Sequence, residues 1–162
     1  MTGVDARSIA LFFFFAFLDE QRAIEATFKA IQNYRSRIAK NPEIKPSVIL
    51  VASTFHIWKS DGSRLIRGRQ NLTSGAGWTL PPGLDLGPWK EFQKTAQEDE
   101  FLSLIWSQIL KLPDEDVALG LNTSIGTLRY RVGKALKRLG AMTNPVFIKP
   151  SAGKHLGVVS DE

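Results

Sequence analysis

The stretch Leu112–Leu139, LPDEDVALGLNTSIGTLRYRVGKALKRL, guides the interpretation of the rest of the chain. Its acidic first part, Asp114 to Leu119, predicts a short helix that points Val117-Ala118 inward. A tight corner at Gly120-Leu121-Asn122 follows, and a basic helix then starts at a polar Thr123-Ser124 cap. The stretch therefore predicts two helices that meet at a sharp turn.

The second of these helices has a packed face and a polar, basic remainder. The packed face repeats at spacings of three and four residues: Leu128, Val132, Ala135 and Leu139. The other side chains, together with the polar start of the helix, are our candidate DNA contacts: Ser124, Ile125, Thr127, Arg129, Tyr130, Arg131, Lys134, Lys137 and Arg138. This combination of turn, cap and packed spacing predicts a helix-turn-helix element that binds nucleic acid.

Each part of the candidate interface has its own chemistry. Ser124 and Thr127 place hydroxyls and free backbone amides at a helix N-terminus, where a phosphate can bind. Arg129 is the candidate reader of a guanine edge, and the later basic residues are candidate phosphate contacts. Gly126 removes a side chain from the first turn, so a partner can come close to the backbone. The competing interpretation is an amphipathic helix with a solvated basic face.

These residues resemble the promoter-binding module of bacterial RNA polymerase sigma factors, especially the extracytoplasmic-function group. Asp116-Val117-Ala118 is similar to the family's Glu-Ile-Ala, and Gly126-Thr127-Leu128-Arg129 to its Gly-Thr-Val-Lys. Arg131 and Ala135 stand where the family usually has Arg and Ala, whereas Gly133 replaces a larger polar residue. The similarity extends from Leu102 through Leu139 and implies binding in the major groove of the upstream promoter element.

The first half resembles the same family more faintly. Residues 19–28, from Asp19 to Phe28, are similar to the helix that grips the polymerase clamp. A second candidate nucleic-acid patch lies where the family melts promoters: Trp58, Lys59, Arg64, Arg67 and Arg69. The dense aromatic and basic pattern of a melting element is missing, so the sequence leaves open whether this region melts DNA or packs.

Composition fits such a role and argues against several others. The net charge is +5, from 21 basic and 16 acidic residues among 162, which suits a polyanionic partner. The chain has no cysteine, and His56 and His155 are far apart, so we expect no disulfide and no metal site. The apolar run Ile9 to Leu18 is too short to span a bilayer, which needs about 20 residues. We expect this run to be buried, no membrane association, and a cytoplasmic protein.

The remaining segments predict an all-α chain. Apolar spacing predicts one or two helices over Ser8–Ala39, with Asp19-Glu20 either starting the second helix or forming a corner. The β-branched stretch from Val48 to about Arg69 fits a strand or a helix, and we predict a helix because no neighbour offers a strand partner. Pro88 is expected to open a helix that continues to Lys111.

We predict two small helical domains joined by a linker that contains both glycine and proline. The N-terminal helical domain covers residues 1–70, the linker 71–87, the helix-turn-helix domain 88–140, and a poorly ordered tail 141–162. An enzyme is not expected, because consecutive carboxylates on a helix point in different directions. We interpret Glu98-Asp99-Glu100 and Asp114-Glu115-Asp116 as solvated acidic faces.

The sequence thus predicts a sigma-factor-like transcription factor without a cofactor. The resemblance implies double-stranded promoter DNA and the RNA polymerase core as partners, and an inhibitory (anti-sigma) protein as a further candidate. The alternative is a sigma-like adaptor or a stand-alone helix-turn-helix regulator that acts through protein contacts and melts no promoter.

Overall fold

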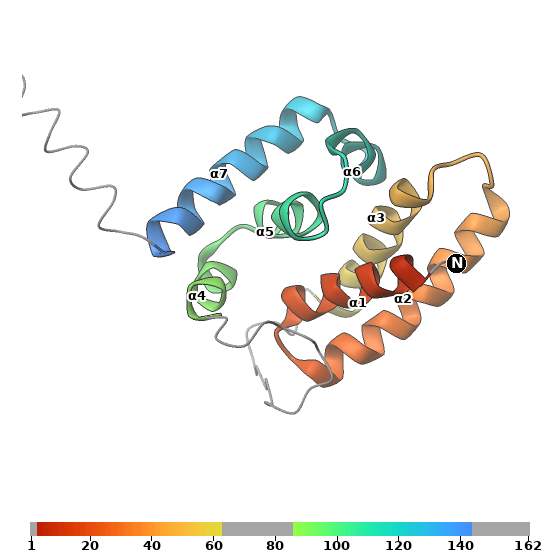
Figure 1. Ribbon diagram of the computed structural model, residues 1–162, viewed down its shortest axis with the longest axis horizontal. Helices are drawn as coiled ribbons and strands as arrows, with labels where there is room; N and C mark the ends of the chain where they lie inside the picture. The colour runs from red at the N-terminus through yellow and green to blue at the C-terminus, as the bar shows by residue number, and fades with distance from the viewer. Residues whose placement is uncertain (1–2, 63–85, 144–162) are drawn as a thin grey trace, which may run out of the picture.

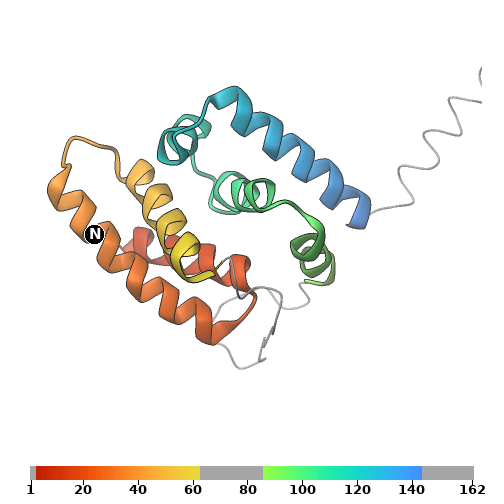
Figure 2. The ribbon, with the colours of Figure 1, turned by 180° about the vertical axis from the view of Figure 1, so that it is seen from behind.

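The computed structural model describes residues 3–62 and 86–143, and within these ranges the chain forms helices and no strands (Figure 1). The prediction of an all-α fold is confirmed. The elements are α1 (Gly3–Phe17), α2 (Glu20–Lys40), α3 (Pro46–Ile57), the π-helical turn η1 (Trp58–Gly62), α4 (Gly87–Thr95), α5 (Glu98–Leu104), the π-helical turn η2 (Ile105–Ile109), α6 (Asp114–Leu121) and α7 (Ile125–Thr143). Helices α1 to α3 lie on one side of the molecule and α7 on the other, with α5 between them (Figures 1 and 2).

The N-terminal segment forms two helices, which resolves the alternative at Asp19-Glu20. Leu18 adopts a left-handed conformation (φ 52°) that turns the chain, and Asp19 then caps α2. The Asp19 carboxylate accepts a hydrogen bond from the backbone N–H of Arg22 at 3.1 Å. A side-chain acceptor satisfies one of the amides that the first turn of a helix leaves without a partner. The second helix therefore begins at this corner.

The phenylalanine-rich helix α1 is buried, as predicted. Ile9, Phe12, Phe13 and Leu18 have no exposed surface, and Phe14, Ala16 and Phe17 are nearly as buried, whereas Ala10, Leu11 and Phe15 are partly buried. No helix in the described part of the chain has the length and apolarity to cross a membrane. The apolar run instead supplies the centre of the hydrophobic core.

The ambiguous segment after Pro46 is a helix rather than a strand. Pro46 lies in the first turn of α3, where its missing N–H costs nothing. The helix buries the consecutive residues Ile49, Leu50 and Val51, so more than half of its circumference is covered by other parts of the chain, whereas His56 is exposed. It continues into η1 as far as Gly62, and the predicted helical residues 63–69 lie outside the described ranges.

The predicted single helix from Pro88 to Lys111 is wrong. The chain leaves helical geometry at Ala96 (ψ 152°) and Gln97 (ψ 148°), so that α4 and α5 are separate helices. The break lets the aromatic side chains of both helices bury against one another, and those of α4 also contact α1. In α4, Trp89 donates its Nε1–H to the carbonyl of Phe15 at 2.8 Å, while its ring contacts Phe101 of α5 at 5.1 Å between centroids.

One hydrophobic core extends across the predicted domain boundary. Phe12 of α1 stacks on Trp106 of η2 with ring centroids 5.0 Å apart, and Trp106 donates its Nε1–H to Thr54 of α3 at 2.9 Å. Buried side chains from both halves belong to the same cluster. The two predicted domains, residues 1–70 and 88–140, therefore have no separate cores. Of the predicted linker only residues 86–87 are described, and of the predicted tail only residues 141–143, which continue α7.

Because Tyr34 is buried, the stability of this core should decrease at alkaline pH. Burial, followed by a hydrogen bond to Asp5, raises the pKa of Tyr34 to about 12. A phenol whose pKa is higher in the folded state stabilises the fold below its unfolded pKa of about 10, and this stabilisation is lost as the pH rises toward 12. Between pH 9 and pH 11 we expect the free energy of unfolding to decrease by roughly 1.4 kcal/mol, corresponding to one pKa unit.

Urea unfolding of the wild type and a Tyr34→Phe variant at both pH values measures this decrease. The exposed Tyr130→Phe is the matched control, and an equal pH dependence in all three proteins would contradict the assignment.

Candidate nucleic-acid interface

Helices α6 and α7 are joined by a short connection that the sequence predicted closely. Asn122 adopts a left-handed conformation (φ 55°) after α6, and the N–H of Thr123 bonds back to the carbonyl of Ala118 at 2.9 Å. Short polar side chains such as asparagine tolerate this conformation better than most. Val117 of α6 and Leu128 of α7 are both fully buried, as predicted. The first helix ends two residues later than expected, because α6 continues from Leu119 through Leu121.

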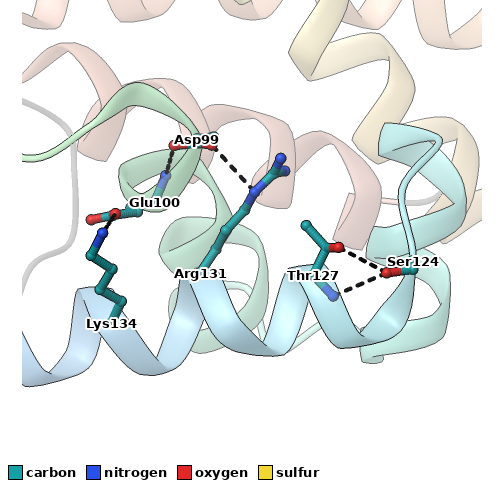
Figure 3. Close-up of polar contacts among 6 residues, drawn as sticks. All are labelled: Asp99, Glu100, Ser124, Thr127, Arg131 and Lys134. Carbon is teal, nitrogen blue, oxygen red and sulfur yellow. Dashed lines mark hydrogen bonds and ion pairs between the residues drawn. The ribbon is translucent and has the colours of Figure 1, made fainter.

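The polar start of α7 caps the helix. The Oγ of Ser124 accepts a hydrogen bond from the backbone N–H of Thr127 at 3.0 Å and donates one to the Thr127 hydroxyl at 2.9 Å (Figure 3). Both side chains are exposed. The predicted cap is confirmed, and it also occupies part of the hydrogen-bonding capacity that we had assigned to a phosphate.

The outer face of α7 combines exposed polar side chains with glycines. Tyr130 is 69 % exposed, and Lys137 is also exposed. Arg129 is 63 % exposed although its Nε contacts Asp114 at 3.0 Å, and such exposed pairs contribute little energy. Side chains added at Gly133 or Gly140 would meet nothing within 4 Å. A rod-like ligand could therefore approach the helix closely along this face.

The flank of α7 that faces α5 is different, because its basic residues are paired. Arg131 contacts Asp99 at 3.2 Å, and Lys134 contacts Glu100 at 3.3 Å (Figure 3). Arg138 lies 3.6 Å from the other carboxylate oxygen of Glu100 and donates to the carbonyl of Thr95 at 3.4 Å. Lys134 also lies over the ring of Tyr130, 5.9 Å from its centroid. Three of the candidate phosphate contacts thus bind carboxylates or a carbonyl of the same chain.

Two acidic segments that we interpreted as solvated faces are partly buried. The side chain of Glu100 is 4 % exposed and that of Asp116 is 5 % exposed. Asp116 accepts a hydrogen bond from Ser47 and contacts Lys45 at 3.5 Å, so this carboxylate joins α6 to the start of α3. A buried carboxylate needs such partners, because the loss of its hydration costs several kcal/mol. The interpretation as solvated faces is therefore wrong for these two residues.

The second candidate patch is not supported by the residues of it that are described. Trp58 is 1 % exposed and stacks on Phe17 with centroids 5.3 Å apart, so its ring belongs to the core and is not presented to a ligand. Lys59 is exposed and pairs with Glu98 at 2.8 Å. Trp58 was predicted on its proximity to basic residues, but its helical position faces α1. The other members, Arg64, Arg67 and Arg69, lie outside the described residues.

Sequence reasoning missed the acidic partners of α7, although a signal was present. Glu100 precedes the buried Ser103 and Leu104 by three and four residues, which places it on the inward face of a helix that starts at Glu98. The cations Arg131, Lys134 and Arg138 likewise recur at three- and four-residue spacing along one flank. Two matching rows of opposite charge would have predicted the pairing once the helix boundary was known.

Comparison of the chain with protein-family models, with curated proteins and with solved structures gave no match.

Proposed function

We propose that this chain is a sigma-factor-like transcription factor that contacts RNA polymerase and reads the upstream promoter element of double-stranded DNA through α7. The observation that carries the proposal is the outer face of α7, where Arg129, Tyr130 and Lys137 are exposed beside glycines on a helix whose N-terminus is capped by Ser124. A helix with this surface fits the major groove, which is wide enough to admit a helix and carries a distinct pattern of donors and acceptors for each base pair.

The proposal gives the candidate residues different roles. Arg129 remains the candidate for a guanine edge, since an arginine fork can bond both acceptors of that base. Lys137 takes the leading role in phosphate contact, because no ion pair within the described residues involves it. The cations that face α5 contact DNA phosphates only when they separate from the carboxylates of Asp99 and Glu100.

Removing the two outer cations tests the proposal. We expect Arg129→Ala with Lys137→Ala to weaken binding to promoter DNA by about tenfold, or about 1.4 kcal/mol, since one base contact and one phosphate contact are lost. The slope of log K against log salt should decrease by about 0.9 for each phosphate contact removed. Fluorescence anisotropy of a labelled promoter duplex over a salt series measures both quantities.

The matched control removes the same charge from the opposite side of the molecule. Arg35→Ala with Lys40→Ala alters two exposed cations of α2, which lies away from α7 in both views (Figures 1 and 2). General electrostatic attraction weakens equally in both double variants, so only a specific interface separates them. Equal affinities for the two variants would refute a role for the outer face of α7.

A protein-binding adaptor is the second candidate, and one observation favours it. Phe28 of α2 is 67 % exposed and Ile24 is 39 % exposed, one turn apart on the same face. Exposed apolar side chains that adjoin one another are typical of surfaces that bind proteins. The adaptor replaces the first proposal if the wild type and the Arg129→Ala, Lys137→Ala variant both co-purify with polymerase while neither binds promoter DNA.

A further inference from the structure

Two consecutive carboxylates in the first turn of α5 hold three cations of α7. Asp99 contacts Arg131 at 3.2 Å and Glu100 contacts Lys134 at 3.3 Å (Figure 3). Glu100 also contacts Arg138 at 3.6 Å. These same cations are predicted to contact phosphates. A nucleic-acid phosphate and an α5 carboxylate would therefore compete for the same guanidinium and ammonium groups.

Glu100 is fixed more firmly than its two cations, and Asp99, whose side chain is 47 % exposed, is held by a backbone amide. Glu100 is buried at 4 % exposure, and the Oδ1 of Asp99 accepts a hydrogen bond from the backbone N–H of Glu100 at 2.9 Å. The side chains of Arg131, Lys134 and Arg138 are 28 %, 44 % and 34 % exposed, and each has a long flexible stem. When a competing anion arrives, the cations are thus the groups that can move.

There is room for that movement beside α7. Asp99 and Arg131 both line an open cavity of about 550 Å³ between α3, α5 and the α6–α7 connection. Arg131 can therefore leave Asp99 without displacing a packed side chain. Water and salt also reach the Arg131–Asp99 pair, whose side chains are 28 % and 47 % exposed, so this pair is weak enough to exchange for a phosphate.

We propose that Asp99 and Glu100 of α5 are intramolecular competitors for nucleic-acid phosphates, which lowers the affinity of α7 for DNA. The proposal rests on the proposed function of α7. DNA then binds only those molecules in which the cations have left their carboxylates. The apparent affinity is the intrinsic affinity multiplied by the fraction of such molecules. Any change that neutralises Asp99 and Glu100 converts the α5-facing flank into additional phosphate-binding surface.

The test compares two double variants of the full chain that carry the same change in net charge. Asp99→Asn with Glu100→Gln releases the three cations of α7. Glu98→Gln with Glu91→Gln releases only Lys59 of η1 and Lys94 of α4, at 2.8 and 3.5 Å from their partners. Anisotropy titrations of a labelled promoter duplex over a salt series give the affinity and the salt slope of each protein.

We expect the Asp99→Asn, Glu100→Gln variant to bind several-fold more tightly than its charge-matched control at low salt. Its salt slope should be steeper by about 0.9 for each cation that gains a phosphate, up to about 2.7 for all three. If the wild type binds but the two variants share one affinity and one slope, the competition is refuted and the proposed function stands. If no protein binds at any salt concentration, the proposed function itself fails.

Folding of the variants is checked by circular dichroism, because Glu100 is buried. If Glu100→Gln unfolds the chain, the single variants Asp99→Asn and Glu98→Gln provide the same comparison on more exposed carboxylates. The expected steepening is then about 0.9, for Arg131 alone. Identical slopes for these single variants would again refute the competition.

Discussion

Replacing Trp106 by alanine should lower the free energy of unfolding by about 3–5 kcal/mol, a large part of the total stability of a chain of this size. Trp106 is 1 % exposed, stacks on Phe12 at 5.0 Å between centroids, and meets Phe55 edge to face at 6.1 Å. Its Nε1–H also bonds to the hydroxyl of Thr54 at 2.9 Å. The substitution therefore leaves a cavity between α1, α3 and η2 and removes a buried hydrogen bond.

Urea unfolding followed by circular dichroism measures this loss, and Trp106→Phe separates its causes. Phenylalanine keeps most of the ring contact but lacks the donor, so it should cost less, about 1–3 kcal/mol. Because the core is continuous, the variant should still unfold in a single transition. Two transitions, with only one of them shifted by Trp106→Ala, would show that the halves unfold as independent domains.

Local patterns were sufficient to predict much of the fold. The N-terminal preference of Pro46 and the apolar spacing of α1 and α2 depend on neighbours within a few residues, and the helices that they predict are confirmed. The buried face of α2 is not its apolar row, however, since Ile24 and Phe28 are exposed. The break at Ala96-Gln97 has no such local signal. It follows from packing, since only a bent chain lets both Trp89 and Phe101 reach the same aromatic cluster around Phe15 and Phe92.

The candidate site was predicted only in part, because local patterns predict features within one helix but not contacts between helices. The cap at Ser124 and the buried face of α7 are properties of one helix, so the sequence contains them. The partner of Arg131 lies 32 positions earlier, and the stacking of Trp58 on Phe17 joins residues 41 positions apart. Contacts at such separations depend on the tertiary arrangement, and one sequence gives no direct measure of them.

Gly120→Ala is expected to destabilise the protein by about 2 kcal/mol, although alanine favours helices by about 1 kcal/mol over glycine. A Cβ at this position of α6 would lie 2.6 Å from the Cβ of Val51 and 2.9 Å from the carbonyl oxygen of Val48, both on α3. A backbone oxygen cannot move aside as the end of a flexible side chain can. The two helices must therefore separate, and Val117 and Ala118, which lie on the buried side of α6, must move with it.

The same chemical change on α7 provides the control. Gly133→Ala adds a methyl group with nothing within 4 Å, so it should stabilise the chain by about 0.5–1 kcal/mol through helix propensity alone. The two variants should thus differ by about 3 kcal/mol in urea unfolding. Val51→Ala alone should cost about 1 kcal/mol or more, and it should restore little of the stability of Gly120→Ala, because alanine keeps the Cβ that would lie 2.6 Å from the added methyl group. If Gly120→Ala instead matched Gly133→Ala, the close contact of α3 and α6 would be refuted. The fixed position of α6, and of the turn that leads into α7, would then lack its main support from the N-terminal half.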